Sequence, residues 1–249
     1  MKINIIGGGN LATQFLKKLL QKTEVEICQW YSRSFKKLVT KNGINKINDL
    51  NYLKPVDINL LMVPDSVISS ISKKIKNKTL TVHSSGSINL KELNNNGGKG
   101  VFYPIQTFTK EKSVDFNNLP ICIETEYKSD YLFLENLARI LNSKPISMSS
   151  EKRKYLHLAA TIVNNFSNHL FSQAEEICIN NEIPFNLLNQ IIKETSLKVI
   201  KNSPKNIQTG PAKRNDKIII EKHLKLLKNS PFKKTYKTIS ESIIKYYEK

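Results

Sequence analysis

The chain has 249 residues, of which 39% are hydrophobic, and 39 basic against 21 acidic residues give a formal net charge of +18. This length suits one large domain or two smaller ones with a buried core, and the composition excludes a disordered chain. The charge could indicate nucleic-acid or membrane binding, but lysines occur in nearly every segment and form no single block. Dispersed charge makes no defined footprint, so we expect no specific nucleic-acid partner.

The cysteines and the lengths of the apolar runs indicate the cellular compartment in which the protein is expected. Cys28, Cys122 and Cys178 lie far apart without a Cys-x-x-Cys pair, which argues against a disulfide framework or a zinc site. No N-terminal targeting signal is visible, and no apolar run reaches the roughly 18–20 residues of a membrane span. We therefore expect a soluble, cytoplasmic protein without a metal and without membrane contact.

Residues 1–149 alternate short apolar runs with segments of helical period. Strands are predicted at residues 3–6, 25–30, 58–63, 80–83, 100–104, 119–124 and 145–147, and helices at 11–20, 66–74 and 130–141. This alternation predicts an α/β domain with a mostly parallel sheet and helices on both faces.

The sequence pattern changes after residue 149. Strand patterns largely vanish, and long helical patterns follow at residues 151–180, 184–202, 215–228 and 231–247. Residues 203–216 contain two prolines and Gly210, which predicts a loop or a short ordered connection. We expect an all-helical second domain over residues 150–249.

The stretch "GGGNLA" places Gly7, Gly9 and Ala12 in the G-x-G-x-x-G/A spacing of a dinucleotide-binding turn. Gly7 would permit a sharp turn, Gly9 would let a pyrophosphate approach the backbone, and Ala12 would let the helix pack closely. The helix N-terminus, capped by Asn10, would present free N–H groups to the phosphates. The residues expected at the pyrophosphate are Gly7, Gly9, Asn10, Leu11 and Ala12. The alternative is a glycine-rich turn without a ligand.

The end of the second predicted strand selects the nicotinamide cofactor. NAD sites usually carry Asp or Glu here for the ribose 2′-hydroxyl, but "QWYSRSFKK" has no acid. Ser32, Arg33 and Ser34 instead supply hydroxyls and a guanidinium, whose forked N–H donors suit a phosphate. We therefore predict NADP(H) rather than NAD(H). Alternatively, Arg33 is a surface residue that caps the next helix.

The stretch "VPDSVI" follows another predicted strand. In open α/β sheets, ligands bind beyond the carboxyl ends of the strands. Val63 and Pro64 would therefore line the cofactor groove. Asp65 or Ser66 would cap the following helix, although Asp65 could also serve as a catalytic acid.

The stretch "TVHSSGS" ends a further strand on the same edge of the predicted sheet. Ser84, Ser85 and Gly86 would therefore lie near the nicotinamide. His83 could bind a carbonyl or donate a proton near neutral pH. The alternative is a histidine that caps the strand and bonds locally.

Two other segments each allow more than one interpretation. In "FYPIQTFT", Gln106, Thr107 and Thr109 could face the nicotinamide, or the segment could be an edge strand whose aromatic side chains pack on the core. In "QTGPAKRND", Arg214 could clamp an anion, the loop could make a dimer contact, or its basic residues could be solvated surface.

The stretch "YLHLAATIVNNFSNHL" carries polar residues at a spacing of four in an otherwise apolar helical pattern, namely His157, Thr161, Asn165 and His169. On an α-helix this spacing places them on one face. The two histidines are too far apart for a zinc pair. Buried polar groups need partners, and an active-site cleft would supply them. The alternative is a solvent-facing stripe.

Taken together, "GGGNLA", "VPDSVI", "HSSGS", "FYPIQTFT", "YLHLAATIVNN" and "TGPAKRND" resemble a bacterial family with a Rossmann-like N-terminal domain and a C-terminal helical domain of unknown function. Its wider kin are similar to pyrroline-5-carboxylate reductase, deazaflavin-dependent NADP oxidoreductases and β-hydroxyacid dehydrogenases. The resemblance implies hydride transfer between NADP(H) and a small C=O or C=N substrate held between the domains. It also implies a homodimer built on the helical domain.

One departure from these kin concerns proton transfer. β-Hydroxyacid dehydrogenases carry a catalytic Lys one turn before an Asn, and if Asn165 matches that Asn, Thr161 occupies the Lys position. The resemblance instead implies that His157 and Asn165 face the substrate. His83, from its place at a strand end, is an alternative acid. The alternative function is a non-catalytic NADP-binding sensor or partner-docking protein, because a fold does not fix a function. A third interpretation is a nucleic-acid binder driven by the net charge.

Overall fold

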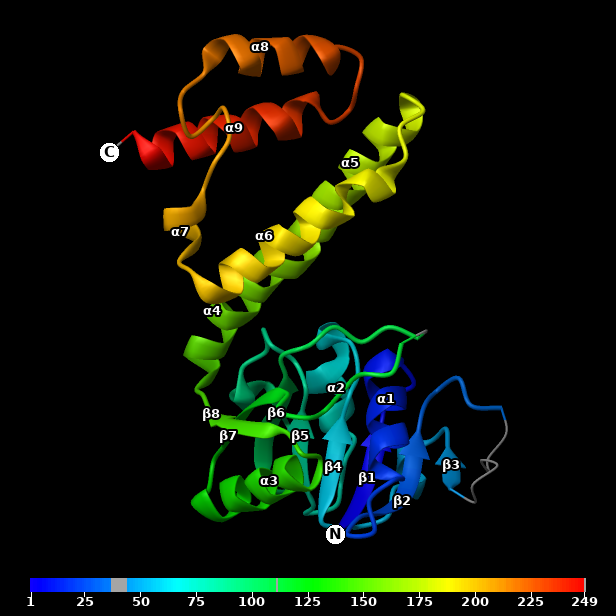
Figure 1. Ribbon diagram of the computed structural model, residues 1–249. Helices are drawn as coiled ribbons and strands as arrows, with labels where there is room; N and C mark the ends of the chain where they lie inside the picture. The colour runs from blue at the N-terminus through cyan, green and yellow to red at the C-terminus, as the bar shows by residue number, and fades with distance from the viewer. Residues whose placement is uncertain (37–43, 111, 249) are drawn as a thin grey trace. The chain divides into compact units, whose positions relative to one another are not determined.

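A computed structural model describes residues 1–36, 44–110 and 112–248 of the chain. The chain forms two compact units, Met1–Val163 and Asn164–Lys249 (Figure 1). Strands occur only in the first unit within the described residues, and the last of them ends at Ser147.

One sheet of eight strands organises the described part of the first unit. The strands are β1 (Lys2–Ile6), β2 (Glu26–Tyr31), β3 (Asn45–Ile47), β4 (Ile58–Leu61), β5 (Leu80–His83), β6 (Lys99–Pro104), β7 (Pro120–Thr125) and β8 (Lys144–Ser147). Their order is β3-β2-β1-β4-β5-β6-β7-β8, and every neighbouring pair is parallel except β6 and β7. The predicted α/β fold with a mostly parallel sheet is therefore confirmed.

Two apolar clusters cover the two faces of this sheet, because alternate side chains of a strand point to opposite faces. On one face, α1 (Asn10–Leu19) and α3 (Lys128–Ile140) pack on β1, β4, β6 and β7 (Figure 1). On this face Phe15 makes edge contacts with Phe102 and Phe116. The other face packs against α2 (Ile68–Ser72), which follows the short 3₁₀ turn η2 (Asp65–Val67), and against Leu90 and Leu93.

A row of buried polar side chains crosses the centre of the sheet. The Asn4 amide Nδ2 donates to Asn59 Oδ1 at 3.0 Å, and Asn59 Nδ2 donates to Thr81 Oγ1 at 3.2 Å. Asn4 pairs with Asn59 and Asn59 with Thr81 in the strand register, so these bonds run straight across β1, β4 and β5. We call Asn4, Asn59 and Thr81 the amide row.

The predicted helix over residues 151–180 consists of three consecutive segments. They are α4 (Ser150–Ala160), the π-helical segment η4 (Thr161–Phe166) and α5 (Ser167–Asn180). The residues spaced by four therefore do not share one regular α-helix, because a π-helix bonds i to i+5. His157 belongs to α4, Thr161 and Asn165 belong to η4, and His169 belongs to α5.

The second unit is all-helical in its described residues. After α5 come η5 (Phe185–Leu188), α6 (Asn189–Lys201), α7 (Pro204–Ile207), α8 (Lys217–Leu226) and α9 (Lys233–Tyr247), with α8 and α9 in contact. Its buried side chains are few, namely Gln173, Cys178, Ala212, Ile220 and Ser240. In the described ranges, no helix combines the length and the apolar character needed to cross a membrane.

Candidate functional site

The glycine turn after β1 has the geometry that its spacing predicts. Gly7 has φ +143°, a conformation that side chains rarely adopt, and a Cβ there would lie 2.0 Å from the carbonyl oxygen of Met62. The Gly7 N–H donates to the Tyr31 carbonyl at 2.9 Å, and the Trp30 indole N–H donates to the Gly7 carbonyl at 2.7 Å. Residues at the end of β2 therefore hold the turn, and only glycine fits there.

Open space lies at the start of α1. A Cβ on Gly9 would meet no atom within 4 Å. Gly9 is the N-cap residue, and no side chain accepts from the first turn of α1. The predicted cap is therefore wrong: Asn10 is already helical, and its Nδ2 donates to the Phe108 carbonyl at 3.1 Å. Uncapped N–H groups and the positive dipole end suit an anion.

A cavity of about 370 Å³ opens in front of this turn. Residues from the ends of β1, β2 and β4 and from α2 surround it. Of the predicted cofactor residues, those that line it are Gly7, Gly9, Asn10, Leu11, Ser32, Arg33, Val63 and Pro64. Ala12 does not line it, because it is fully buried in the core beneath α1.

Hydroxyl and cationic side chains gather where β2 ends. Ser32 Oγ lies 3.0 Å from Ser34 Oγ, and it would lie 2.6 Å from a Cβ on Gly8. Arg33 lines the first cavity and also a second one of about 820 Å³.

Lysines extend the positive charge along the second cavity. Lys73, Lys74 and Lys76 line it, together with one acid, Asp49. The sequence motifs did not indicate these lysines, although the run "KKIKNK" at residues 73–78 begins in the last two residues of the predicted helix at 66–74. Their charges and that of Arg33 would stabilise a phosphate near the end of β2.

The loops after β4 and β5 are joined side by side. Leu61 at the end of β4 pairs with His83 at the end of β5. Four residues beyond each of them, the Ser87 hydroxyl donates to Asp65 Oδ2 at 2.5 Å. The expected capping role of Asp65 or Ser66 is wrong, because Pro64 is the N-cap of η2 and no side chain caps that turn. Asp65 instead links two neighbouring strand ends.

His83 is a buried, neutral member of this edge. Its side chain has no exposed surface, and its Nδ1 accepts from the Ser85 amide at 3.2 Å. Burial, followed by the positive charge of Arg153, lowers the pKa of His83 to about 4. An imidazole with that pKa holds no second proton near pH 7.

Ser84 and Ser85 differ in their surroundings. Ser85 Oγ accepts from the amides of Ser87 and Ile88 at 3.1 Å, so it shapes the loop after β5. Ser84 Oγ is buried and has no hydrogen-bond partner among the described residues. Neither serine lines the cavity at the glycine turn.

A histidine–tyrosine pair packs against the next strand end. The Tyr103 hydroxyl, at the end of β6, lies 3.1 Å from His157 Nδ1, and the two rings meet edge-on at 78°. Gly86 lies against both rings, since a Cβ there would approach His157 Nδ1 to 2.6 Å and Tyr103 Cζ to 2.8 Å. The structure therefore brings the candidate site residues Gly86 and His157 together. Tyr103 of β6 contacts both of them.

Sequence reasoning missed Tyr103. It named Gln106, Thr107 and Thr109 from the same stretch, and the Gln106 side chain bonds the neighbouring Thr107 amide. The edge-strand alternative is wrong, because β6 lies between β5 and β7. The available signal was a phenol at the carboxyl end of a strand next to the histidine- and serine-rich loop.

A buried charge anchors the helix that carries His157. Arg153 has no exposed surface, and its guanidinium binds Glu124 Oε2 and the Ile88 carbonyl, both at 2.5 Å. Ser150 Oγ donates to Glu124 Oε2 at 2.6 Å and accepts from the Leu90 amide at 3.0 Å. We call Glu124, Ser150 and Arg153 the arginine clamp.

The arginine clamp also keeps the Glu124 carboxylate ionised. Burial alone would raise the pKa of Glu124, but hydrogen bonds from Ser150 and Arg153 outweigh burial and hold that pKa below its ordinary value. The pair therefore stays ionised at neutral pH. His157 follows Arg153 by one helical turn, so the clamp fixes the part of α4 that presents His157.

The other polar residues of the predicted stripe have local partners. Thr161 Oγ1 donates to the His157 carbonyl at 3.0 Å, and Asn165 Oδ1 accepts from Asn164 Nδ2 at 2.8 Å. In α5, the His169 imidazole bonds Gln173 at 2.9 Å.

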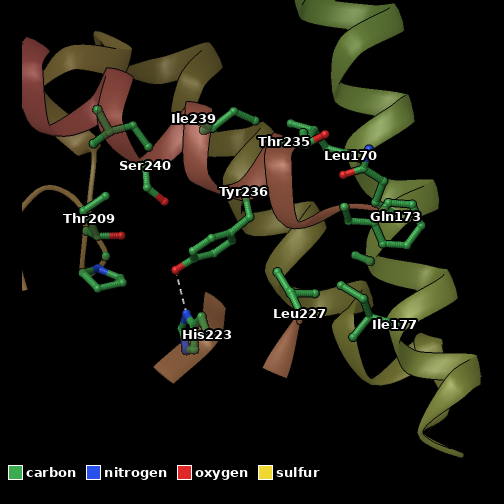
Figure 2. Close-up of a pocket in the computed structure, with 16 residues that line it drawn as sticks. Leu170, Gln173, Ile177, Thr209, His223, Leu227, Thr235, Tyr236, Ile239 and Ser240 are labelled. Atoms are coloured by element: carbon green, nitrogen blue, oxygen red, sulfur yellow. Dashed lines mark hydrogen bonds between the residues drawn. The ribbon is translucent and has the colours of Figure 1, made fainter. Parts of the chain in front are cut away.

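The loop before α8 lines an apolar cavity within the second unit. Asp216 caps α8 by accepting from the Ile219 amide at 3.1 Å. Residues Thr209 to Ala212 form one wall of a cavity of about 390 Å³, and α5, α8 and α9 form the others (Figure 2). His223 Nδ1 and the Tyr236 hydroxyl bond at 2.7 Å beside it. Arg214 is not part of this lining.

No group of three or more His, Cys, Asp or Glu in the ranges that the structure describes could hold a metal ion. The strand order β3-β2-β1-β4-β5-β6 is that of the Rossmann fold, and the glycine turn lies at the point where the order reverses between β1 and β4. Fold and turn together define a Rossmann-type α/β protein with a helical C-terminal unit.

The chain belongs to the family described as "Domain of unknown function (DUF2520)", which it matches over residues 119–243. It is also similar to the candidate NADP oxidoreductase BF3122 of Bacteroides fragilis, with 34% identity, 98% of each chain covered and a TM-score of 0.86. A search of the curated proteins finds no match.

Two more distant structures share the fold. Pyrroline carboxylate reductase of Plasmodium falciparum, solved with NADP bound, is 13% identical over 99% of this chain and 97% of its own, with a TM-score of 0.61. The imine reductase of Myxococcus stipitatus, in complex with NADP⁺, is 13% identical over 100% of this chain and 93% of its own, with a TM-score of 0.67.

Substitutions at the two glycines of the turn should differ in their effect on stability. We expect Gly7→Ala to lower the free energy of unfolding by more than about 2 kcal/mol, because of the strained φ and the clash with Met62. Gly9→Ala should lower it by about 1 kcal/mol or less, since the added methyl meets nothing and only the preference of the N-cap for glycine over alanine is lost. Urea unfolding of both variants measures the difference. Equal losses would contradict this account of the turn.

Proposed function

We propose that the protein is an NADP(H)-dependent oxidoreductase that reduces a small C=O or C=N compound or oxidises the corresponding product. One observation carries this proposal: the candidate site residues of the first unit lie in sequence along a single edge of the sheet. The glycine turn follows β1, Val63 and Pro64 follow β4, Gly86 follows β5, and His157 packs on Gly86. NADP(H), when bound, supplies or accepts the hydride.

The glycine turn suits the pyrophosphate of this cofactor. The space at Gly9 and the uncapped N-terminus of α1 offer N–H donors to an anion without a side chain in the way. Leu11 and Asn10 line the same cavity. Ser84, Ser85 and Gly86 are proposed to lie near the nicotinamide, since their loop is bonded to the loop that contains Pro64 and Asp65.

The preference for NADP(H) rests on Arg33 with Ser32 and Ser34. Arg33 faces both cavities at the end of β2, and three lysines line the outer one. A 2′-phosphate would gain charge-assisted hydrogen bonds there that a 2′-hydroxyl would not.

We expect Arg33→Gln to weaken NADPH binding roughly 10–100-fold, because a hydrogen bond to a charged group contributes about 1.5–3 kcal/mol. NADH binding should change little. Titration calorimetry measures both affinities, and Arg139→Gln is the matched control, since Arg139 pairs with Glu135 on α3. Equal affinities of the unaltered protein for NADH and NADPH would contradict the proposed preference.

His157 is the proposed proton carrier. Its Nδ1 is bonded to Tyr103, so Nε2 is the atom that would give a proton to the substrate oxygen or nitrogen on reduction and remove it on oxidation. Asn165 and Thr161 are proposed to face the substrate from η4. We assign this proton transfer to His157 and not to His83, because His83 is buried and neutral.

A screen of NADPH oxidation against aldehydes, keto acids and cyclic imines tests the activity. With a turned-over compound, His157→Gln should lower kcat about 10²–10⁴-fold and leave NADPH affinity unchanged, because general acid–base catalysis contributes that much. His169→Gln, in α5, is the control. Tight NADPH binding without turnover of any compound would instead favour a non-catalytic sensor.

We further propose that the protein is a homodimer built on its helical unit. This unit exposes large apolar side chains along α5, η5 and α6, including Phe171, Leu187, Ile191 and Ile200, while it buries few of its own. The same unit contains the apolar cavity bounded by α5, α8 and α9 (Figure 2). Large apolar side chains exposed in this number favour a protein interface.

Light scattering should therefore give twice the 28.5 kDa mass of the chain. Ile191→Glu should shift this equilibrium towards monomer, because it places a charge on the apolar surface of α6. The neighbouring Gln190→Glu adds the same charge at a polar position and should leave the mass unchanged. A monomeric unaltered protein would exclude the dimer.

A further inference from the structure

We propose that Tyr103 is the positioning residue for His157: its hydroxyl holds the imidazole so that Nε2–H, and not Nδ1–H, is left for the substrate. This inference rests on the proposed function insofar as it gives His157 a substrate. Tyr103 is not among the site residues that the sequence motifs indicate.

The strand register places Tyr103 at the candidate site. His83 of β5 pairs with Val101 of β6, so Tyr103 lies level with Ser85, at the carboxyl end of the sheet. From there its hydroxyl reaches His157 Nδ1 at 3.1 Å. Because the two residues come from β6 and α4, the bond joins the sheet directly to the helix.

Gly86 makes the contact close. Neither ring could keep its place beside a larger residue, since a Cβ on Gly86 would lie 2.6 Å from His157 Nδ1 and 2.8 Å from Tyr103 Cζ. The backbone of the loop after β5 therefore forms a wall that both rings touch. With this wall on one side and Tyr103 bonded to Nδ1, the opposite edge of the imidazole, which carries Nε2, is left for the substrate.

The environment of Tyr103 keeps its hydroxyl proton available for this hydrogen bond. Burial raises the pKa of the Tyr103 phenol, so it keeps its proton at neutral pH. A neutral phenol that donates to Nδ1 requires the imidazole proton to be on Nε2. The same oxygen can accept from Nδ1–H when His157 is protonated, so the pair persists in both charge states.

Tyr103 is therefore not the source of the transferred proton. If it gave its proton to Nδ1 while Nε2 released one, a tyrosinate would remain in a half-buried place, which burial disfavours. The transferred proton comes from the imidazolium form of His157: Nε2 gives its proton to the substrate while Nδ1–H stays bonded to the Tyr103 oxygen, and the reverse reaction returns the proton to Nε2. Solvent then restores the Nε2 proton, since the His157 side chain is only partly buried.

The predicted tautomer narrows the substrate class. Nε2–H is a hydrogen-bond donor both in this tautomer and in the protonated ring, so it suits an atom with a free lone pair. A carbonyl oxygen or an unprotonated imine nitrogen has such a lone pair, whereas the nitrogen of a protonated iminium does not.

The arginine clamp holds α4 independently of Tyr103, so the position of the helix and the orientation of the His157 ring can be tested separately. Arg153 holds the α4 backbone through Glu124 and the Ile88 carbonyl, with no help from Tyr103. Removal of the Tyr103 hydroxyl should therefore leave α4 in place and release only the orientation of the His157 ring. A change in ring tautomer without a change in fold is the expected signature.

Nitrogen NMR of the protein labelled with ¹⁵N-histidine tests the inference without a substrate. The signals of His157 are assigned by their loss in His157→Gln. We expect the Nε2–H tautomer in the unaltered protein, and in Tyr103→Phe an increase of about five- to tenfold in the ratio of Nδ1–H to Nε2–H, the effect of one hydrogen bond. Tyr127→Phe, at an exposed tyrosine, should leave the ratio unchanged.

Two results would overturn the inference. One is a predominant Nδ1–H tautomer in the unaltered protein, which would make Tyr103 an acceptor. The other is a His157 tautomer ratio that is the same in Tyr103→Phe and the unaltered protein. Thermal unfolding of Tyr103→Phe checks that the fold is retained.

Kinetics separate this inference from the proposed function. If a substrate is turned over, Tyr103→Phe should lower kcat about tenfold while KM for NADPH stays the same. If no compound is turned over and the tautomer ratio still responds to Tyr103, the proposed function fails and the positioning role stands.

Discussion

A buried guanidinium holds the candidate site together. The Arg153 side chain has no exposed surface and pairs with Glu124. Removal of one partner of such a buried pair costs about 3–5 kcal/mol of stability, because the other charge is left unpaired. Its partners come from β7 and from the loop after β5, so one side chain fixes where α4 leaves the sheet. The positions of His157 and Gly86 both depend on this contact, and its charge also lowers the pKa of buried His83.

The parallel sheet explains how residues distant in sequence come to one edge. Parallel strands end at the same side, so the loops after β1, β2, β4, β5 and β6 all lie there. The antiparallel β7 then returns the chain, which brings Glu124 under the start of α4. The cofactor residues and the histidine–tyrosine pair therefore follow from strand order as much as from side-chain chemistry.

Local patterns predicted the parts of the fold that depend on nearby residues. The strands with apolar runs and the glycine turn follow from short stretches of sequence, and both are present. The three-residue β3 was missed, because Asn45 and Lys46 give no apolar run. The stripe at a spacing of four assumed an α-helix, and the π-helical segment η4 replaces it over residues Thr161 to Phe166.

Contacts between distant segments could not be read from the sequence. Tyr103 and His157 are 54 residues apart, and nothing near either residue indicates the other. The capping role of Asn10 failed for a similar reason, since its partner, the Phe108 carbonyl, is 98 residues away. The Asp65–Ser87 bond spans 22 residues, which likewise places it beyond any helix or turn pattern.

The amide row has a consequence for how the sheet avoids misfolding. A slip of one residue between β1 and β4 would turn Asn4 away from Asn59 and towards the other face of the sheet, where Phe15 and Phe102 lie. The Asn4 amide would have no partner there. An apolar residue at these positions would tolerate several alignments, whereas the amides accept only one. The row therefore favours one alignment of β1, β4 and β5, and with it the alignment of the loops at the carboxyl edge.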